Sequence, residues 1–230
     1  MFRFKEFEIE DKNASMKVGT DAVLLGAWAE VSNAQHILDV GTGCGIIALM
    51  LAQRTTEGTT IEGVDIDDKN IRQANENLMT TRWCNRVLFH HASLQSFHSL
   101  HQYDLIVSNP PYFQNSLLPP THSRQQARHN HSLPFEDLIT HSKRLLKVTG
   151  KLCLILPVTE GNQFKESALQ HHLCLEKEVA VFIKASKPQE RWLLEFSLSN
   201  GKTTTEKIVL FDDNGSKSKP YQNLTDKFYL

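Results

Sequence analysis

Several features of common protein classes are scarce in this sequence of 230 residues. Its four cysteines stand far apart with no C-x-x-C pair, which argues against a zinc ribbon, a thioredoxin-type site and a secreted disulfide framework. No apolar run approaches membrane-spanning length, and the opening MFRFKEFEIEDK lacks the apolar stretch of a signal peptide. We therefore expect reduced thiols and a cytoplasmic protein without membrane contact.

An excess of charge is also missing. Twenty-five Lys and Arg face 26 Asp and Glu, which gives a formal net charge of -1 at pH 7. A nucleic-acid site must therefore be a local patch rather than a property of the whole surface.

Internal repeats are missing too, and the length suits one globular domain with its own core. We expect a single domain over residues 1–230, with a monomer favoured.

What the sequence does contain is an alternation of strand and helix patterns from residue 36 onward. This alternation predicts an α/β fold, a mainly parallel sheet with helices on both faces. Two late strand patterns without an intervening helix predict an antiparallel hairpin at one edge of the sheet. The expected strands are 36–40, 60–64, 86–91, 103–108, 151–157, 174–183 and 191–199, and the expected helices are 20–30, 46–54, 68–79, 135–146 and 164–172.

A glycine-rich turn, in the segment LDVGTGCGIIALMLA, joins the first strand to its helix. Gly41, Gly43 and Gly45 stand at the first crossover of the sheet, where folds of this kind bind nucleotides. Glycine lets the backbone approach a ligand closely, and the next helix offers free N–H groups at its N-terminus. Ile46 stands where a dinucleotide fingerprint has its third glycine, which disfavours NAD.

The end of the second strand carries a matching acidic residue. In VDID, the carboxylate of Asp65 can accept both ribose hydroxyls of an adenosine. The glycines alone would also be explained by a tight turn that binds nothing. Together with Asp65 they predict a site for an adenosyl cofactor.

The fourth strand runs directly into the tetrapeptide Asn109-Pro110-Pro111-Tyr112, which indicates the chemistry. An adenine amino group is a poor nucleophile because its lone pair is delocalised into the ring. The Asn109 side-chain oxygen and the Pro110 carbonyl can accept both N–H hydrogens, which frees the lone pair for attack on a methyl group. The prolines stiffen the turn, and Tyr112 can stack on the base. We expect methyl transfer without a metal or a general base.

DVGTGCG, VDID and NPPY, in this order at the ends of three strands, resemble the amino-group methyltransferases with a seven-stranded Rossmann-like sheet. Their cofactor is S-adenosyl-L-methionine. More narrowly, MKVGTDAVLLGAWA and the ending DKFYL resemble the bacterial tRNA1(Val) adenine-37 N(6)-methyltransferase family, and the match spans nearly the whole chain. The resemblance implies methylation of N(6) of an adenosine beside the anticodon of tRNA. It also implies that residues 1–35 form an extension that contributes to the site.

By this resemblance Gly41, Gly43, Asp65 and Asn109 take the cofactor and catalytic roles of the family, and we expect residues 109–112 as a whole to form the catalytic turn. One departure follows the third strand, where this class has an Asp for the adenine amino group of the cofactor and this chain has Ala92-Ser93. Ser93, or the backbone amide of Leu94, would take that place. The expected cofactor-binding residues are Lys17, Gly19, Thr20, Asp21, Asp39, Gly41, Thr42, Gly43, Gly45, Asp65, Ile66, Ser93, Leu94 and Asn109.

A long loop without acidic residues, between Asp104 and Glu136, follows the catalytic turn and carries Arg124 and Arg128. We expect these arginines to contact RNA phosphates, with an ordinary solvated loop as the alternative. The next candidates for RNA contact are Lys184, Lys187 and Arg191. The letters HNH at 129–131 have no accompanying cluster of ligands, so no metal site is expected.

Three other functions stay open. A protein glutamine N(5)-methyltransferase offers the same motif a planar amide nitrogen, but such enzymes usually carry a separate N-terminal helical domain. Only about 35 residues precede the first strand here. A guanine-amino-group RNA methyltransferase is a second hypothesis. The third is a cofactor-binding scaffold without activity, which would have no need of two acceptors beside the methyl group.

Overall fold

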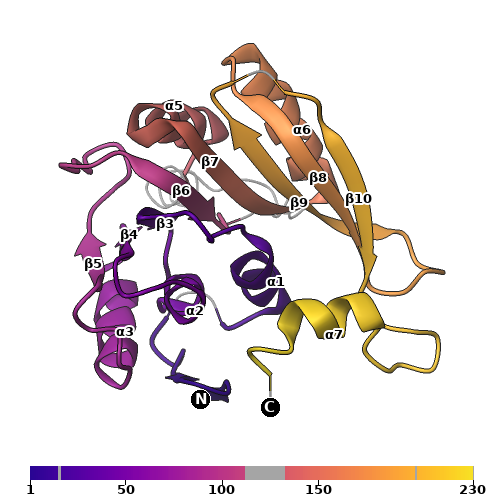
Figure 1. Ribbon diagram of the computed structural model, residues 1–230, viewed down its shortest axis with the longest axis horizontal. Helices are drawn as coiled ribbons and strands as arrows, with labels where there is room; N and C mark the ends of the chain where they lie inside the picture. The colour runs from indigo at the N-terminus through magenta and orange to yellow at the C-terminus, as the bar shows by residue number, and fades with distance from the viewer. Residues whose placement is uncertain (15–16, 112–132, 200, 230) are drawn as a thin grey trace, which may run out of the picture.

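The computed structural model in Figure 1 describes residues 1–14, 17–111, 133–199 and 201–229. The helices and strands follow one another largely as the sequence patterns predict. In chain order they are β1 (Phe2–Arg3), β2 (Glu8–Ile9), α1 (Thr20–Trp28), β3 (His36–Val40), α2 (Ile46–Arg54), β4 (Thr60–Asp65), α3 (Asp68–Met79), β5 (Val87–His91), β6 (Tyr103–Ser108), α5 (Phe135–Leu145), β7 (Leu146–Pro157), α6 (Val158–Gln170), β8 (Cys174–Phe182), β9 (Gln189–Ser197), β10 (Thr204–Val209) and α7 (Lys219–Thr225).

The described residues form one large sheet with the strand order β10-β8-β9-β7-β6-β3-β4-β5, and a separate two-stranded pair of β1 and β2. In the large sheet only β9 runs antiparallel to its two neighbours, β7 and β8. All other neighbouring strands are parallel. The α/β class and the mainly parallel sheet that the sequence predicts are therefore confirmed.

The number of strands and the sheet edge differ from the prediction. Seven strands ending in an antiparallel hairpin were expected, but β10 pairs in parallel with the outer side of β8, from Thr204↔Lys177 to Val209↔Phe182. The sheet thus has eight strands in the described chain, and the β8–β9 hairpin is not its edge. The sequence TTEKIV does not predict this strand, because only Ile208 among its six residues is buried and the apolar alternation typical of a strand is missing.

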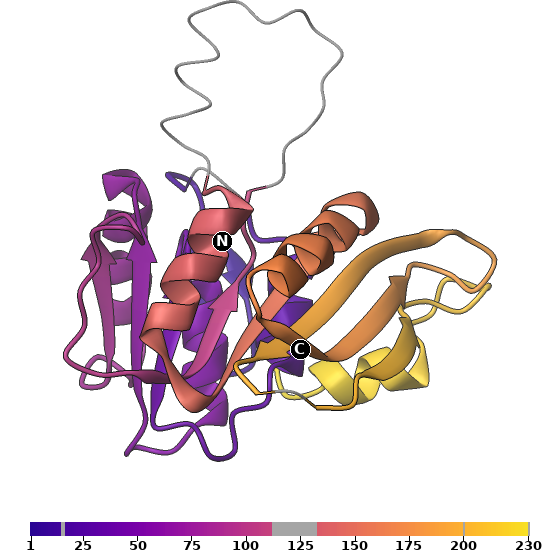
Figure 2. The same cartoon turned by 90° about the horizontal axis from the view of Figure 1, so that it is seen from above.

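Helices cover both faces of the sheet. The core on one face draws residues from α1, α2, α3 and α7, and the core on the other draws residues from α5 and α6. Figure 2 shows α5 and α6 next to each other on their face. Along β7, Cys153 and Ile155 belong to the first core and Leu152 and Leu154 to the second. Burial on both faces is why this strand reads as an unbroken apolar run.

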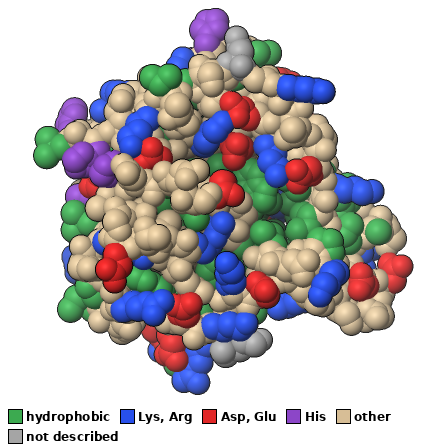
Figure 3. Space-filling model, in the orientation of Figure 1, with side chains coloured by type: hydrophobic (Ala, Val, Ile, Leu, Met, Phe, Trp, Pro, Cys, Tyr) green, Lys and Arg blue, Asp and Glu red, His purple; other side chains and the backbone are tan. Residues whose placement is uncertain are grey.

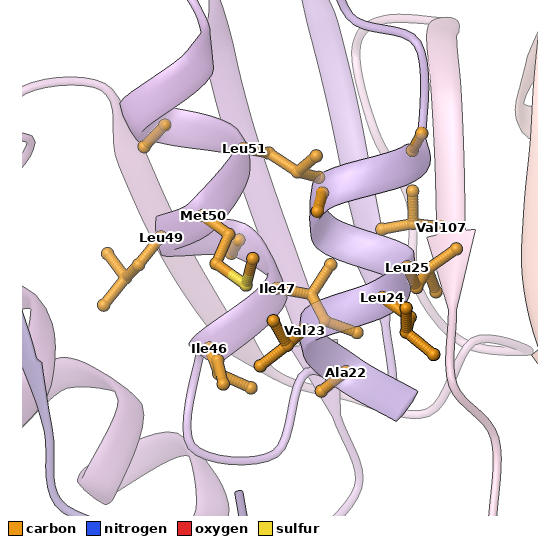
Figure 4. Close-up of a cluster of buried hydrophobic side chains, with 14 of the residues drawn as sticks. Ala22, Val23, Leu24, Leu25, Ile46, Ile47, Leu49, Met50, Leu51 and Val107 are labelled. Carbon is orange, nitrogen blue, oxygen red and sulfur yellow. The ribbon is translucent and has the colours of Figure 1, made fainter. Parts of the chain in front are cut away.

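Helices α1 and α2, which respectively precede β3 and follow the glycine turn, pack side by side, and neither has a polar face (Figure 4). Residues 22–27 of α1 and 46–52 of α2 are all buried. A Cβ at Gly26 would lie 2.9 Å from Sδ of Met50, so this glycine lets the helices approach closely. A helix without a polar face needs cover on every side. Phe4 and Phe7 near one chain end and Phe228 near the other belong to this core and provide that cover.

Gly63→Ala tests the packing of β4 under the glycine turn. A Cβ at Gly63 would lie 2.5 Å from Cδ1 of the buried Phe89 and 2.8 Å from Oγ1 of Thr42. We expect overpacking to lower the free energy of unfolding by about 1–3 kcal/mol in urea titrations. Gly58→Ala is the matched control, because within the described ranges a Cβ there would lie more than 4 Å from every atom beyond its chain neighbours. A change of more than about 0.5 kcal/mol is not expected there, and equal losses at both glycines would contradict this packing.

Candidate active site

Three neighbouring strands end level with one another at the carboxyl edge of the sheet. In the register of β4, β3 and β6, Val40 lies opposite both Val64 and Ser108. In the sheet, β4 lies on one side of β3 and β6 lies on the other, so the strand order reverses at β3. Open α/β sheets bind ligands at such a reversal. The three sequence motifs therefore meet. The residues that follow the level of Val40 are Gly41, Asp65 and Asn109.

A cavity of about 790 Å³ opens at this edge, a size ordinary for a small-molecule or cofactor site. Its walls come from the glycine turn, the ends of β4, β5 and β6, and the segment before α1. The predicted site residues that line it are Lys17, Gly41, Thr42, Gly43, Asp65, Ile66, Ser93, Leu94, Asn109, Pro110 and Pro111. Lining residues that the sequence did not single out include Asp67, Asn70, Gln95, Ser108 and Leu133.

Five other predicted residues do not line the cavity but stand in the chain next to a lining residue or, for Gly19 and Thr20, between the lining residues Lys17 and Ala22. They are Gly19, Thr20, Asp21, Asp39 and Gly45. Gly19 and Thr20 lead into α1, and the carboxylate of Asp21 binds Nε of Arg191 in β9 at 2.8 Å. Predicted residues Tyr112, Arg124 and Arg128 lie outside the described residues.

The glycine turn takes its shape from three residues in the left-handed region. Gly41, Gly43 and Gly45 have φ of 72°, 57° and 84°, which other L residues rarely adopt. Among the described residues, chain neighbours aside, a Cβ at Gly41 or Gly43 would meet no atom within 4 Å, whereas one at Gly45 would lie 2.8 Å from Cζ of Phe89. Gly41 and Gly43 therefore keep room open beside the cavity, and Gly45 allows α2 to pack against β5.

The carboxylate of Asp65 holds the glycine turn to the start of α3. Oδ2 accepts from the Gly43 N–H at 2.9 Å and from Nδ2 of Asn70 at 3.1 Å, and Oδ1 accepts from the Asp67 N–H at 2.9 Å. A carboxylate offers about four lone-pair sites, so capacity remains for a ligand hydroxyl. Asn70 is buried, and its place on the inner side of α3 one turn after Asp67 is the only signal in the sequence that could have identified it.

Asp39 holds the glycine turn from its buried side through hydrogen bonds to Thr42 and Ala48. It is fully buried, and Oδ2 accepts from Oγ1 of Thr42 at 2.7 Å and from the Ala48 N–H at 3.2 Å. Its Oδ1 has no hydrogen-bond partner in the part of the chain that the structure describes. Burial raises the pKa of the Asp39 carboxyl to about 7; the two hydrogen bonds oppose this shift, and the nearby charge of Asp65 adds to it.

The Asn109 turn is anchored to the neighbouring strand. Oγ of the buried Ser108 donates to the Val40 carbonyl at 2.8 Å, which ties the end of β6 to the start of the glycine turn. Asn109 is half-buried and lines the cavity with Pro110 and Pro111. Neither proline has a backbone N–H, so the backbone here presents carbonyl acceptors without competing donors.

The end of β5 forms the opposite wall. The Ser93 hydroxyl accepts from the Ser96 N–H at 3.2 Å and so begins a short helical turn, while Leu94 is buried. Gln95 lines the same wall and donates Nε2 to Oδ2 of Asp137 in α5 at 2.8 Å. Ile66, half exposed, offers an apolar surface to the cavity. The wall therefore combines apolar side chains with a small number of polar groups, as ligand pockets commonly do.

Of the basic residues predicted to contact RNA, three lie near the β8–β9 turn at the same carboxyl edge. Lys187 is exposed, and Nζ of Lys184 donates to the Asp213 carbonyl at 3.1 Å. Arg191 is engaged by Asp21. Among the described residues, no three His, Cys, Asp or Glu side chains are grouped to hold a metal ion. Within the same ranges, no helix has the length and apolar character needed to cross a bilayer.

The family model described as "Methyltransferase small domain" matches residues 14–181. A tRNA1(Val) (adenine(37)-N6)-methyltransferase of Dyadobacter fermentans is 38% identical over 233 residues, covering 100% of this chain and 97% of that protein. The protein of the same name from Tolumonas auensis is 40% identical over 229 residues, covering 100% and 96%. A "predicted O-methyltransferase" of Agrobacterium tumefaciens superimposes with a TM-score of 0.71 at 16% identity, covering 90% and 96% of the two chains, and this likeness shows the fold.

Asp39→Asn tests the buried carboxyl through the pH dependence of stability. The folded pKa of about 7 lies above the ordinary value of 3.8. Between these values the folded protein keeps a proton that the unfolded chain has lost, so this group makes the wild type less stable as pH rises through the window. Asn does not titrate. The free energy of unfolding of the variant, relative to wild type, should therefore rise from pH 4 to about 7 and then level off in urea titrations. Parallel curves for the two proteins would contradict the assignment.

Proposed function

Because the chain belongs to the methyltransferase small-domain family and matches its tRNA1(Val) (adenine(37)-N6)-methyltransferase relatives along its whole length, we propose that it methylates N6 of an adenosine in tRNA. The methyl donor is S-adenosyl-L-methionine and the target is position 37 of tRNA1(Val). One structural observation carries the proposal: Gly41, Asp65 and Asn109 stand side by side on three strand ends around one cavity.

The residues present fit this cofactor. Gly41 and Gly43 leave a side of the turn open, and the first N–H groups of α2 lie behind it. Asp65 would hold the ribose with its remaining acceptor capacity, and Ile66, Ser93 and Leu94 would surround the nucleobase. When bound, the cofactor supplies a methyl group on a positively charged sulfur, which takes the electron pair of the broken carbon–sulfur bond.

Asn109 and Pro110 prepare the acceptor nitrogen. The Asn109 side-chain oxygen and the Pro110 carbonyl accept the two hydrogens of the adenine amino group, so its lone pair turns out of the ring toward the methyl carbon. The new nitrogen–carbon bond forms in this attack, and the surplus proton then leaves the nitrogen for solvent. Because the proton is lost after the attack, the step needs no base to remove it beforehand. The proposed stacking of Tyr112 on the base rests on the sequence alone.

The proposed contact with tRNA uses local basic residues. Figure 3 shows both signs of charge interspersed over one face of the molecule, in keeping with the net charge of -1. Lys184 and Lys187 lie at the edge of the sheet that carries the cavity, so RNA backbone flanking a bound adenosine can pass over them. Arg191 contributes less because Asp21 already binds it. From the sequence, Arg124 and Arg128 join this set.

Asn109→Ala separates catalysis from cofactor binding. We expect turnover to fall by about two orders of magnitude or more, since one preorganised transition-state contact is lost, while cofactor affinity stays within a few-fold. Nucleoside mass spectrometry of tRNA from a deletion strain should show N6-methyladenosine restored by the wild-type gene and not by the variant. A tRNA profile unaffected by the deletion, with loss of methylglutamine or methylguanosine elsewhere, would move the function to one of the other two enzyme classes.

Salt-dependent titrations test the RNA contacts. If Lys184 and Lys187 neutralise phosphates, replacing both with Ala should weaken tRNA binding and flatten the plot of log K against log salt by up to about 2 units. The matched control is the double change Lys202→Ala and Lys207→Ala, which removes the same charge from exposed positions at and before the edge strand β10. Equal slopes for the two double variants would show that the β8–β9 turn does not hold phosphate.

A further inference from the structure

Asn77 is a buried residue near the end of α3, and both the Nδ2 and the Oδ1 of its side chain form hydrogen bonds with backbone groups. Nδ2 donates to the carbonyls of Glu10 and Cys44, both at 2.9 Å, and Oδ1 accepts from the Glu10 N–H at 2.9 Å. The side chain is 4% exposed. It therefore pairs with both backbone groups of Glu10, as a neighbouring strand would, and at the same time holds the glycine turn at Cys44.

The segment that Asn77 holds leads to the cavity wall. Asp11 accepts the Val18 N–H with Oδ2 at 2.9 Å, and Nζ of Lys17 donates to the Asp11 and Lys12 carbonyls at 2.6 and 3.2 Å. The described parts of residues 10–18 thus close on themselves around Asp11. Lys17 and Cys44 both line the cavity, while Asn77 is not among its lining residues. Asn77 is therefore bonded to one cavity-lining residue, Cys44, and to Glu10, which precedes the Asp11 that binds Lys17 and Val18.

We propose that Asn77 is a positioning residue of the cofactor site, which fixes the N-terminal segment carrying Lys17 against the glycine turn. The proposal rests on the proposed function of this cavity and adds a residue that no motif marks. Buried amide groups that lose their partners carry a desolvation cost, so the segment has one strongly preferred docking geometry while Asn77 is present.

The expected signature follows from population shift. If the N-terminal segment is docked against the glycine turn in only a fraction of the molecules, the apparent dissociation constant for the cofactor equals the intrinsic constant divided by that fraction. Bound cofactor restores the docked state, and therefore turnover at saturating cofactor is retained. A residue that only stabilised the fold would lower thermal stability without this split between affinity and turnover.

Two pairs of variants test the proposal. Asn77→Leu keeps the branched shape of the side chain and removes all three hydrogen bonds. Its control is Asn75→Leu, since Asn75 is exposed on the same helix and, among the described residues, is seen to bond only to the Ile71 carbonyl. Glu10→Pro removes the N–H that Asn77 accepts without touching the core, and its control Glu10→Ala removes the same side chain but keeps that N–H. The second pair keeps the test valid if Asn77→Leu does not fold.

Calorimetric titration with S-adenosylmethionine and steady-state kinetics with tRNA give the readouts. Asn77→Leu and Glu10→Pro should bind the cofactor about tenfold more weakly and raise its KM alike, with kcat at saturation and the KM for tRNA within about twofold. Hydrogen exchange should quicken in residues 8–13 while the sheet stays protected. Ile208→Val, on the far edge strand, serves as a variant of lowered stability with unchanged affinity.

The outcomes separate the two proposals. Wild-type protein that fails to bind S-adenosylmethionine would overturn the proposed function, and the role of Asn77 would fall with it. Wild-type binding with unchanged affinity in Asn77→Leu and Glu10→Pro would overturn the role of Asn77 alone. Equal loss of affinity in Ile208→Val, or in the Asn75→Leu and Glu10→Ala controls, would reduce that role to general stability and overturn it as well.

Discussion

The bond between the Asp65 carboxylate and the Gly43 N–H is the interaction on which the site depends. It joins the end of β4 to the glycine turn, and through Asp67 and Asn70 the same carboxylate fixes the start of α3. The turn therefore lies between two acidic groups with different roles. Asp65 borders the cavity, whereas Asp39 is buried behind the turn, where burial and the charge of Asp65 raise its pKa to about 7. One carboxyl lines the cavity, and the other holds Thr42 and the start of α2.

Cover for the apolar helices explains why both chain ends lie under the site. Since α1 and α2 have no polar face, the side away from the sheet must be closed by other residues. The Lys5 N–H donates to the Phe228 carbonyl at 2.9 Å, and Nε2 of Gln53 in α2 donates to the Lys227 carbonyl at 2.7 Å. The DKFYL ending, which carries part of the family resemblance, thus supports the glycine turn through the helix that follows it.

The sequence predicts the elements of the site well because parallel strands bring their carboxyl ends to one edge. Gly41, Asp65 and Asn109 could be placed together from strand patterns alone. The seven expected strands are present, while β10 was missed because its exposed Thr, Glu and Lys side chains follow no apolar alternation. The pairing of Asp21 with Arg191, 170 positions apart, depends on how β9 enters the sheet, and no local pattern encodes that.

The bonding partners of buried polar residues such as Asn77 cannot be predicted from the sequence, and the reason is physical. Asn70, Gln73 and Asn77 occupy the inner side of α3, where apolar residues are the rule. Asn70 donates to Asp65 just before the helix, whereas Gln73 and Asn77 bond to Asn13 and Cys44, which are distant in sequence. Helical periodicity reveals that such a residue is buried but not what it binds. The same dependence on distant partners links Arg191, beside the β8–β9 turn, to Asp21 at the start of α1, which borders the cavity. Under the proposed function, phosphate held at that turn would therefore lie on an element bonded to the start of α1 beside the cavity, and the proposed RNA and cofactor sites would share one connected framework.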